Sequence, residues 1–227
     1  MNTDFLKNLS RVIDISCVKP EHTLSDIDRM ADEAIKHRFV CAFALPSLTP
    51  HLIARLKGEA DISVGGTVGF PSGCDTTESK VFQAKELLRM GCGELDMVVN
   101  IAGVKSRRYG DVSRDIRAVV DAAGGVPVKV ILEVALLTDA EIVRAAEVAA
   151  DAGAAFVKTG TGWCSKPTEV RHIRLIRQAV QERAKIKAAG GIRDLNTMLE
   201  MAKAGCDRFG IGLDSALKIL RQAGQIL

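Results

Sequence analysis

The chain has few aromatic residues, little net charge and no long apolar run. Aromatic residues make up 4% of its 227 residues, and no apolar run approaches the about 18 residues that a membrane-spanning helix needs. The chain has 31 Lys and Arg residues and 28 Asp and Glu residues, which gives a formal net charge of +3. Its basic residues are spread along the chain and form no basic block. We therefore expect neither nucleic acid nor a membrane as a partner. The hydrophobic fraction of 47% excludes a disordered chain.

The cysteines lack the close pairing of a zinc or redox site. Six of them are scattered along the chain without C-x-x-C spacing, and the four histidines do not cluster with them. We therefore expect free, mostly buried thiols and no structural metal. The first residues, MNTDFLKNLSR, carry charges where a signal peptide has its apolar segment, so we expect a cytoplasmic protein.

What the sequence does contain is a repeated pair of elements. Short β-branched runs recur, and each is followed by a helical stretch that opens on a capping residue and closes near glycine. Thr138 and Glu141 have the spacing of a capping box, and Gly91 is placed to end a helix. The predicted strands are Val12–Val18, Val40–Leu45, Ile62–Gly69, Glu94–Asn100, Val128–Val134, Phe156–Thr159, Ile186–Ala189 and Arg208–Ile211. The predicted helices are Ser25–Arg38, Pro50–Lys57, Thr77–Met90, Asp111–Ala123, Thr138–Ala152, Pro167–Arg183, Asp194–Ala204 and Asp214–Gln222.

These strand–helix units favour a closed barrel. The runs VKVILEV and ELDMVVN lack a clean alternation of apolar and polar residues, which is typical of parallel strands buried under helices. No composition break or linker divides the chain. We therefore expect an α/β protein with a single (β/α)8 TIM-barrel domain over residues 1–227 and a short N-terminal helix.

Polar residues that are costly to bury stand in several predicted strands. A barrel enzyme carries its chemistry at the C-terminal ends of its strands, so each of these residues is a candidate for the site. Lys129 and Glu133 lie four residues apart in VKVILEV and are expected to share one face of their strand. The other candidates are Asp14, Asp96, Lys158 and Lys187.

Two of these candidates are lysines at equivalent places on neighbouring strands. Adjacent strands lie less than about 5 Å apart, so the ammonium groups of Lys158 and Lys187 oppose each other's protonation and one pKa is expected to fall. A neutral lysine attacks carbonyls and forms Schiff bases. Asp96 would keep the other lysine charged and in position. The alternatives are a Lys158 that reaches solvent at the barrel rim and an Asp96 that is merely paired to a lysine.

Two glycine-rich turns follow the last two predicted strands. Gly190 and Gly191 precede Arg193, and Gly212 follows the final strand. These are the loops at which barrels commonly bind phosphate, because glycines expose backbone N–H groups and the next helix favours an anion. The alternative for each glycine pair is a simple turn, and Asp214 could be only the cap of the last helix.

At these residues the chain resembles the class I, Schiff-base deoxyribose-phosphate aldolases. The resemblance runs over nearly the whole chain and is specific. It is carried by VIDIS, GGTVGFPSG, DTTESKVFQAKE, ELDMVVNIAGVKS, DIRAVV, VKVILEVALLTD, AGAAFVKTGTGW, IKAAGGIRD and DRFGIG. It implies that Lys158 is the Schiff-base lysine and that Lys187 and Asp96 handle protons.

The resemblance also implies the reaction, which is the reversible cleavage of 2-deoxy-D-ribose 5-phosphate to D-glyceraldehyde 3-phosphate and acetaldehyde. No metal or other cofactor is implied, because the protonated imine does the work of a Lewis acid. The family often forms homodimers. The residues expected to bind the substrate are Asp14, Ser16, Lys129, Thr161, Gly162, Gly190, Gly191, Arg193 and Gly212.

The chain departs from the family pattern around the expected phosphate site. The turn KTSTG, often followed by Lys or Phe, is here KTGTG followed by Trp163. Gly212 and Leu213 replace two serines whose hydroxyls help to hold phosphate, and Asp214 follows them. The second strand has FALP instead of CVNP, and DISCVKP replaces DHTLLKP.

These departures leave other functions open. One is the same Schiff-base chemistry on a different or unphosphorylated acceptor. Another is an isomerase or decarboxylase that uses lysine and aspartate without a covalent intermediate. A third is a barrel that only binds or regulates, against which the intact set of Lys158, Lys187 and Asp96 argues.

Overall fold

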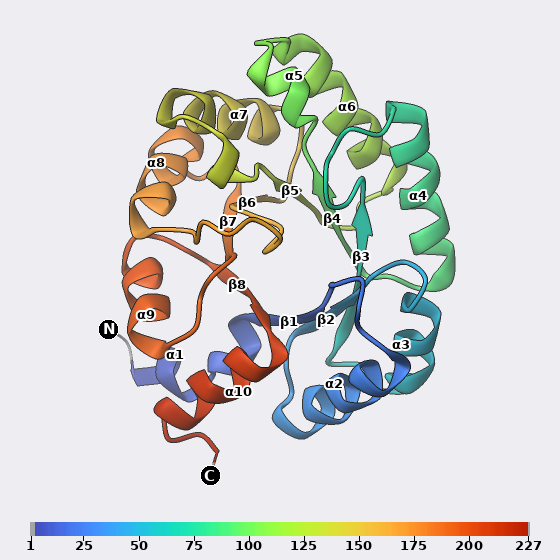
Figure 1. Cartoon of the computed structure of the whole chain (residues 1–227), viewed down its shortest axis with the longest axis vertical. Helices are drawn as coiled ribbons and strands as arrows, with labels where there is room; N and C mark the ends of the chain where they lie inside the picture. Colours follow the sequence, from blue (N-terminus) through green and yellow to red (C-terminus); the bar gives the residue numbers. More distant parts are fainter. Residues whose placement is uncertain (1–2, 227) are drawn as a thin grey trace.

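The computed structural model describes the backbone of residues 3–226 and the side chains of residues 5–226. Its strands form one closed parallel barrel in the order β1 to β8, and β1 pairs with both β2 and β8 (Figure 1). The strands are β1 (Ile13–Cys17), β2 (Cys41–Ala44), β3 (Ser63–Val68), β4 (Glu94–Val98), β5 (Val128–Ile131), β6 (Phe156–Lys158), β7 (Lys185–Ala189) and β8 (Arg208–Gly212). The predicted (β/α)8 barrel is therefore confirmed.

Helices surround the barrel and separate successive strands (Figure 1). The α-helices are α1 (Thr3–Lys7), α2 (Leu24–His37), α3 (Thr49–Arg55), α4 (Thr77–Met90), α5 (Ile101–Lys105), α6 (Tyr109–Ala122), α7 (Asp139–Asp151), α8 (Val170–Val180), α9 (Leu195–Lys203) and α10 (Leu213–Gln222). Short 3-10 helices span Leu9–Val12 and Val134–Leu136. The predicted N-terminal helix is α1. None of the described helices combines the length and the apolar character needed to cross a membrane.

Local signals in the sequence explain where the helices begin and end. Thr138 caps α7, because its hydroxyl accepts the N–H of Glu141 at 3.3 Å while the Glu141 carboxylate accepts the N–H of Thr138 at 2.8 Å. Gly91 ends α4 with φ of 114°, a left-handed conformation that glycine adopts at little cost. Both predicted boundaries are confirmed.

Element boundaries differ from the sequence predictions after β4 and before α8. The strand predicted to run to Asn100 ends at Val98, because the Asn100 side chain accepts the N–H of Gly103 at 2.8 Å and caps the short helix α5. The helix predicted from Pro167 begins at Val170. Thr168 is held instead on the end of β7, where its N–H donates to Gly190 O at 2.9 Å and its hydroxyl to Ala189 O at 2.6 Å.

Lys129 and Glu133 do not share a strand face, so that prediction was wrong. β5 ends at Ile131, and Glu133 has φ of 56° and ψ of 62°, outside the extended region. The period-two rule fails once the chain leaves the strand. The Glu133 carboxylate accepts the N–H of Thr161 at 3.2 Å and also its hydroxyl proton, so it orders the turn after β6.

A buried ion pair outside the barrel interior joins α4 to α6. Lys80 Nζ lies 2.6 Å from Asp115 Oδ2, and the two side chains are 0% and 4% exposed. Lys80 also donates to Val98 O at 3.1 Å, and the Thr77 hydroxyl donates to Asp115 Oδ1 at 2.9 Å. These bonds tie the end of β4 to the surrounding helices.

Candidate active site

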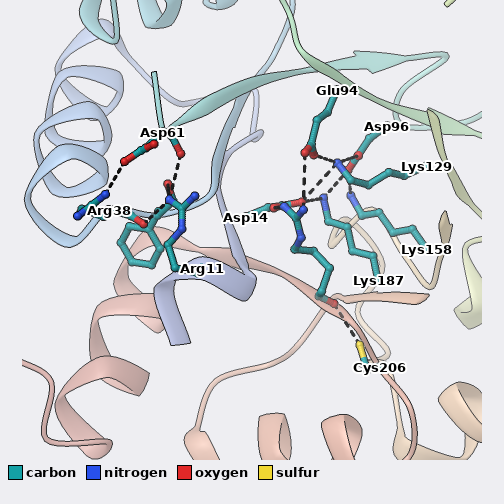
Figure 2. A network of polar contacts seen from close by, with 12 residues as sticks. Arg11, Asp14, Arg38, Asp61, Glu94, Asp96, Lys129, Lys158, Lys187 and Cys206 are labelled. Carbon is teal, nitrogen blue, oxygen red and sulfur yellow. Dashed lines mark hydrogen bonds and ion pairs between the residues drawn. The ribbon is translucent and has the colours of Figure 1, made fainter. Parts of the chain in front are cut away.

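Three of the predicted side chains meet inside the C-terminal end of the barrel. Lys158 of β6 and Lys187 of β7 are register partners, as expected from their equivalent places in the sequence. Both ammonium groups point to Asp96 of β4 and donate to the same oxygen, Oδ2, at 2.6 Å from Lys158 Nζ and 2.8 Å from Lys187 Nζ (Figure 2). The structure thus places both amines on one carboxylate oxygen.

A second carboxylate extends this network toward the interior. Asp14 Oδ2 lies 2.6 Å from Lys187 Nζ and 3.5 Å from Lys129 Nζ (Figure 2). Lys129 Nζ is also 3.3 Å from Asp96 Oδ1 and pairs with Glu94. Arg208 Nη1 lies 2.6 Å from Asp14 Oδ1. Four cations therefore face three carboxylates, and the cluster is electrically balanced when one lysine is neutral.

Lys158 is the lysine whose pKa is lowered. Its residue is 7% exposed. Burial is the main cause of the lowered pKa, the Lys187 and Lys129 cations add to it, and the Asp96 carboxylate opposes it. The resulting pKa of Lys158 is about 8. The sequence predicted that one lysine would lose its proton more easily, but it assigned the effect to the neighbouring cation, whereas loss of hydration is the larger cause.

Asp96, Asp14 and Lys129 keep their charges at neutral pH. Burial would raise the pKa of Asp96, but the cations of Lys158, Lys187 and Lys129 hold it well below its usual range. Burial likewise acts to raise the pKa of Asp14, and the attraction of Lys187, Lys129 and Arg208 outweighs it and lowers that pKa to about 2. The pKa of Lys129 is raised, because Asp96 and Asp14 outweigh the effect of burial.

These shifts predict how the reactivity of Lys158 depends on pH. The ammonium form has no lone pair, so carbonyl attack requires the neutral amine. With a pKa of about 8, Lys158 is protonated below that pH and neutral above it. We expect the rate of borohydride trapping with acetaldehyde to rise about tenfold per pH unit below this value and to level off above it. A profile that rises only near the usual lysine pKa would contradict this.

Phe43 packs against all three lysines. Its ring centroid is 4.2 Å from Lys187 Nζ, 4.8 Å from Lys129 Nζ and 5.9 Å from Lys158 Nζ. The ring fills the space in front of its register partner Gly65, where a Cβ would lie 2.1 Å from the ring. The π face stabilises the cations without adding a competing acceptor.

The candidate residues line a pocket of about 340 Å³. It extends from Lys158 and Lys187 to the turns after β7 and β8. The predicted binding residues on its wall are Asp14, Ser16, Thr161, Gly162, Gly190, Gly191, Arg193 and Gly212. Lys129 is not among the lining residues and lies beneath the aspartates at 0% exposure.

The outer end of the pocket has the features of an anion site. Gly190 and Gly191 have positive φ values of 96° and 80°, so their loop follows a path that other residues rarely adopt. Gly212 is the N-cap of α10, and because glycine has no side chain, no N-cap side chain bonds to the first N–H groups of this helix. Asp214 is therefore not the cap. It lies in the first turn of α10, and its Oδ1 is 2.6 Å from Arg29 Nη2 of α2.

A metal ion does not fit the carboxylates of this cluster. Among the side chains that the structure describes, Asp14, Cys41 and Glu94 offer ligand atoms within 4.8 Å of one another. Lys129 and Arg208 already pair with both carboxylates. Burial also raises the pKa of the Cys41 thiol, which keeps the thiol protonated. The donor set is thus neutralised by cations of the protein itself.

Sequence reasoning missed several members of the network. Glu94 and Arg208 are the first residues of β4 and β8, whereas the expected site residues were those at the C-terminal ends of the strands. Phe43 enters the sequence analysis only as the first residue of FALP, which stands where the family has CVNP. A signal exists for Arg208, which opens the otherwise apolar strand RFGIG, and for Glu94, which lies two residues before Asp96 and therefore on the same face of β4.

A closed parallel barrel that holds a buried lysine of lowered pKa beside a carboxylate has the architecture of a barrel enzyme. A model of the DeoC/LacD aldolase family matches residues 15–222. The chain belongs to this family and is an aldolase, a lyase.

Known relatives agree with this assignment. The deoxyribose-phosphate aldolase of Sinorhizobium medicae is 44% identical over 220 residues, which cover 97% of this chain and 89% of that protein. The enzyme of the same name from Methanothermobacter thermautotrophicus is 44% identical over 211 residues, covering 92% and 93%. The structure of deoxyribose phosphate aldolase from Aeropyrum pernix, described as tetrameric, superimposes with a TM-score of 0.86 at 30% identity and covers 98% of this chain and 93% of that one.

Proposed function

We propose that this aldolase cleaves 2-deoxy-D-ribose 5-phosphate reversibly to D-glyceraldehyde 3-phosphate and acetaldehyde through a Schiff base on Lys158. The observation that carries the proposal is the contact of Lys158 and Lys187 with a single oxygen of Asp96. It places one carboxylate between the amine of Lys158, whose pKa is lowered, and the amine of Lys187. Three relatives named for this substrate class support the choice of substrate.

The first steps form the imine. The neutral amine of Lys158 adds to the C1 aldehyde, and loss of water gives the protonated imine. The Lys187 ammonium, bound to Asp96 and Asp14, is placed to give a proton to the leaving hydroxyl. Asp96 remains charged because its pKa is held far below neutral, so it stabilises the iminium that replaces the Lys158 ammonium.

Carbon–carbon cleavage then draws electrons into the iminium. The C3 hydroxyl loses its proton, the C2–C3 bond breaks, and its electron pair forms an enamine on the two-carbon fragment. D-Glyceraldehyde 3-phosphate leaves with C3 as its new aldehyde. Protonation of the enamine at C2 and addition of water to the imine release acetaldehyde and restore Lys158.

The outer pocket would hold the phosphate. The backbone around Gly190 and Gly191, the Arg193 guanidinium and the N-terminus of α10 all face this end. Exposed N–H groups and a helix N-terminus favour an anion. The lost serine hydroxyls at Gly212 and Leu213 leave the backbone donors in place.

The comparison of 2-deoxyribose with its 5-phosphate tests the substrate. Each charge-assisted hydrogen bond to phosphate contributes about 1.5–3 kcal/mol, so we expect the phosphate to raise kcat/KM by at least about tenfold. Steady-state rates on both sugars measure this directly. Equal kcat/KM values would overturn the proposed substrate and leave the Schiff-base chemistry standing.

One observation favours the second candidate, an aldolase for unphosphorylated acceptors. The carboxylates of Asp214 and Asp26 also line the outer pocket and would repel a phosphate dianion. The Arg29 partner neutralises Asp214, which is why we place the phosphorylated substrate first. The homodimer and the cytoplasmic location remain predictions from the sequence.

A further inference from the structure

The turn after β6 crosses the mouth of the barrel. Figure 1 shows the segment between β6 and α8 projecting over the barrel centre. Trp163 contacts the opposite side, where its Nε1 donates to Val18 O at 2.8 Å after β1 and its ring meets Phe70 after β3 at a centroid distance of 5.8 Å. Its own N–H donates to the Thr161 hydroxyl at 3.0 Å. Trp163 therefore joins three loops at the pocket entrance.

Lys19 lies against this turn from the β1–α2 loop. Its Nζ donates to Gly162 O at 3.0 Å and lies 5.1 Å from the centroid of the Trp163 ring. Both Lys19 and Gly162 line the pocket. The contact joins residues 143 positions apart in the sequence, so it exists only because the barrel brings the two loops together.

The Lys19 ammonium stands beside the glycine turn expected to bind phosphate. A Cβ on Gly190 would lie 3.8 Å from both the N and the Cα of Gly162, whose carbonyl holds Lys19. The Lys19 ammonium is thus bound to Gly162, and Gly162 lies directly beside the backbone of the turn. Arg193 lines the same end of the pocket.

The charge of Lys19 is not neutralised by a neighbouring acid. No ion pair within 4.0 Å joins Lys19 or Arg193 to a carboxylate among the side chains of residues 5–226, whereas Arg29 is paired with Asp214. The outer pocket therefore offers an incoming anion two cations that no ion pair holds, against the carboxylate of Asp26. A neutral carbonyl is the weaker acceptor, so a phosphate oxygen would displace Gly162 O from Lys19.

We propose that Lys19 binds the phosphate of the substrate and that Trp163 is the positioning residue that holds its ammonium group at the pocket. This inference rests on the proposed function and deepens it. Trp163 acts through its ring face, which keeps Lys19 at the entrance, and through the Nε1 bond that fixes the ring to Val18 O. Lys19 thereby makes the site selective for a doubly charged terminal group.

The test measures kcat/KM for 2-deoxyribose and its 5-phosphate in wild type and in Lys19→Gln. We expect Lys19→Gln to lower the phosphorylated-to-unphosphorylated ratio by about tenfold, corresponding to about 1.4 kcal/mol, mainly through KM. Lys19→Arg should restore most of the ratio. Lys166→Gln is the matched control, because Lys166 is an exposed lysine of the β6–α8 segment that carries Trp163 and lies outside this pocket.

Two further readouts separate binding from a structural role. Inorganic phosphate should inhibit the wild type competitively, and its inhibition constant should rise by about tenfold in Lys19→Gln. Trp163→Leu should raise KM for the phosphorylated sugar more than Trp163→Phe, which keeps a ring face. A large phosphate gain that persists unchanged in Lys19→Gln would overturn this inference alone. No phosphate gain in the wild type would overturn both this inference and the proposed substrate.

Discussion

Replacing Lys158 by methionine is expected to lower the rate of carbon–carbon cleavage by about 10⁴-fold or more, in line with the loss of other nucleophiles. Methionine keeps an unbranched side chain that is one atom shorter, and it has no amine to add to a carbonyl. Its lack of charge also suits a residue that is 7% exposed, so we expect the fold to persist. The measurement is retro-aldol turnover, with circular dichroism as the check on folding.

Covalent trapping completes the Lys158 experiment. Borohydride with acetaldehyde should add one ethyl group to the wild type, on the peptide that contains Lys158, and none to Lys158→Met. Lys57→Met is the matched control, because Lys57 is exposed and remote from the pocket lining. Cleavage that survives in Lys158→Met would exclude the Schiff base on this residue.

Replacing Asp96 by asparagine is expected to affect both rate and stability. Three ammonium groups lie within 3.3 Å of its carboxylate. Asparagine carries no charge, so these ammonium groups lose the negative charge that balances them. Breaking a buried ion pair costs about 3–5 kcal/mol, and loss of proton handling lowers rates by about 10²–10⁴-fold. Urea unfolding and steady-state turnover measure the two effects.

The pKa of Lys158 supplies a specific readout for Asp96. The carboxylate opposes the lowering of that pKa, so its removal should shift the trapping profile to still lower pH. The matched control is Asp115→Asn, which breaks the buried pair with Lys80 outside the pocket. We expect it to lose comparable stability and to keep turnover. Equal losses of turnover in both variants would show that Asp96 acts only through stability.

Much of the fold could be predicted from the sequence because its signals are local. Thr138 and Gly91 mark helix boundaries through bonds within a few residues. Glu133 could not be placed in the same way. Its conformation depends on Thr161, a partner 28 positions away, whose N–H and hydroxyl bind its carboxylate.

The position of the cluster could be predicted from the sequence, and the physical cause of the lowered Lys158 pKa could be predicted only in part. The places of Lys158 and Lys187 on neighbouring strands indicated that two amines would meet, and the barrel register brings them together. The sequence could not show that burial outweighs repulsion in lowering the Lys158 pKa, because burial depends on the closed barrel. Lys19 was missed since its contact with Gly162 spans loops at opposite sides of the mouth.

The packing of Phe43 on Gly65 bears on which carbonyl donors the enzyme accepts. The Phe43 ring limits the space beside the Lys158 amine. Gly65, against which the ring packs, has no Cβ. Shortening that side chain would open a recess next to the Lys158 amine without moving a loop. On the proposed Schiff-base chemistry, we expect donor aldehydes with a longer alkyl tail than acetaldehyde to fit there, so that position 43 limits the size of the donor.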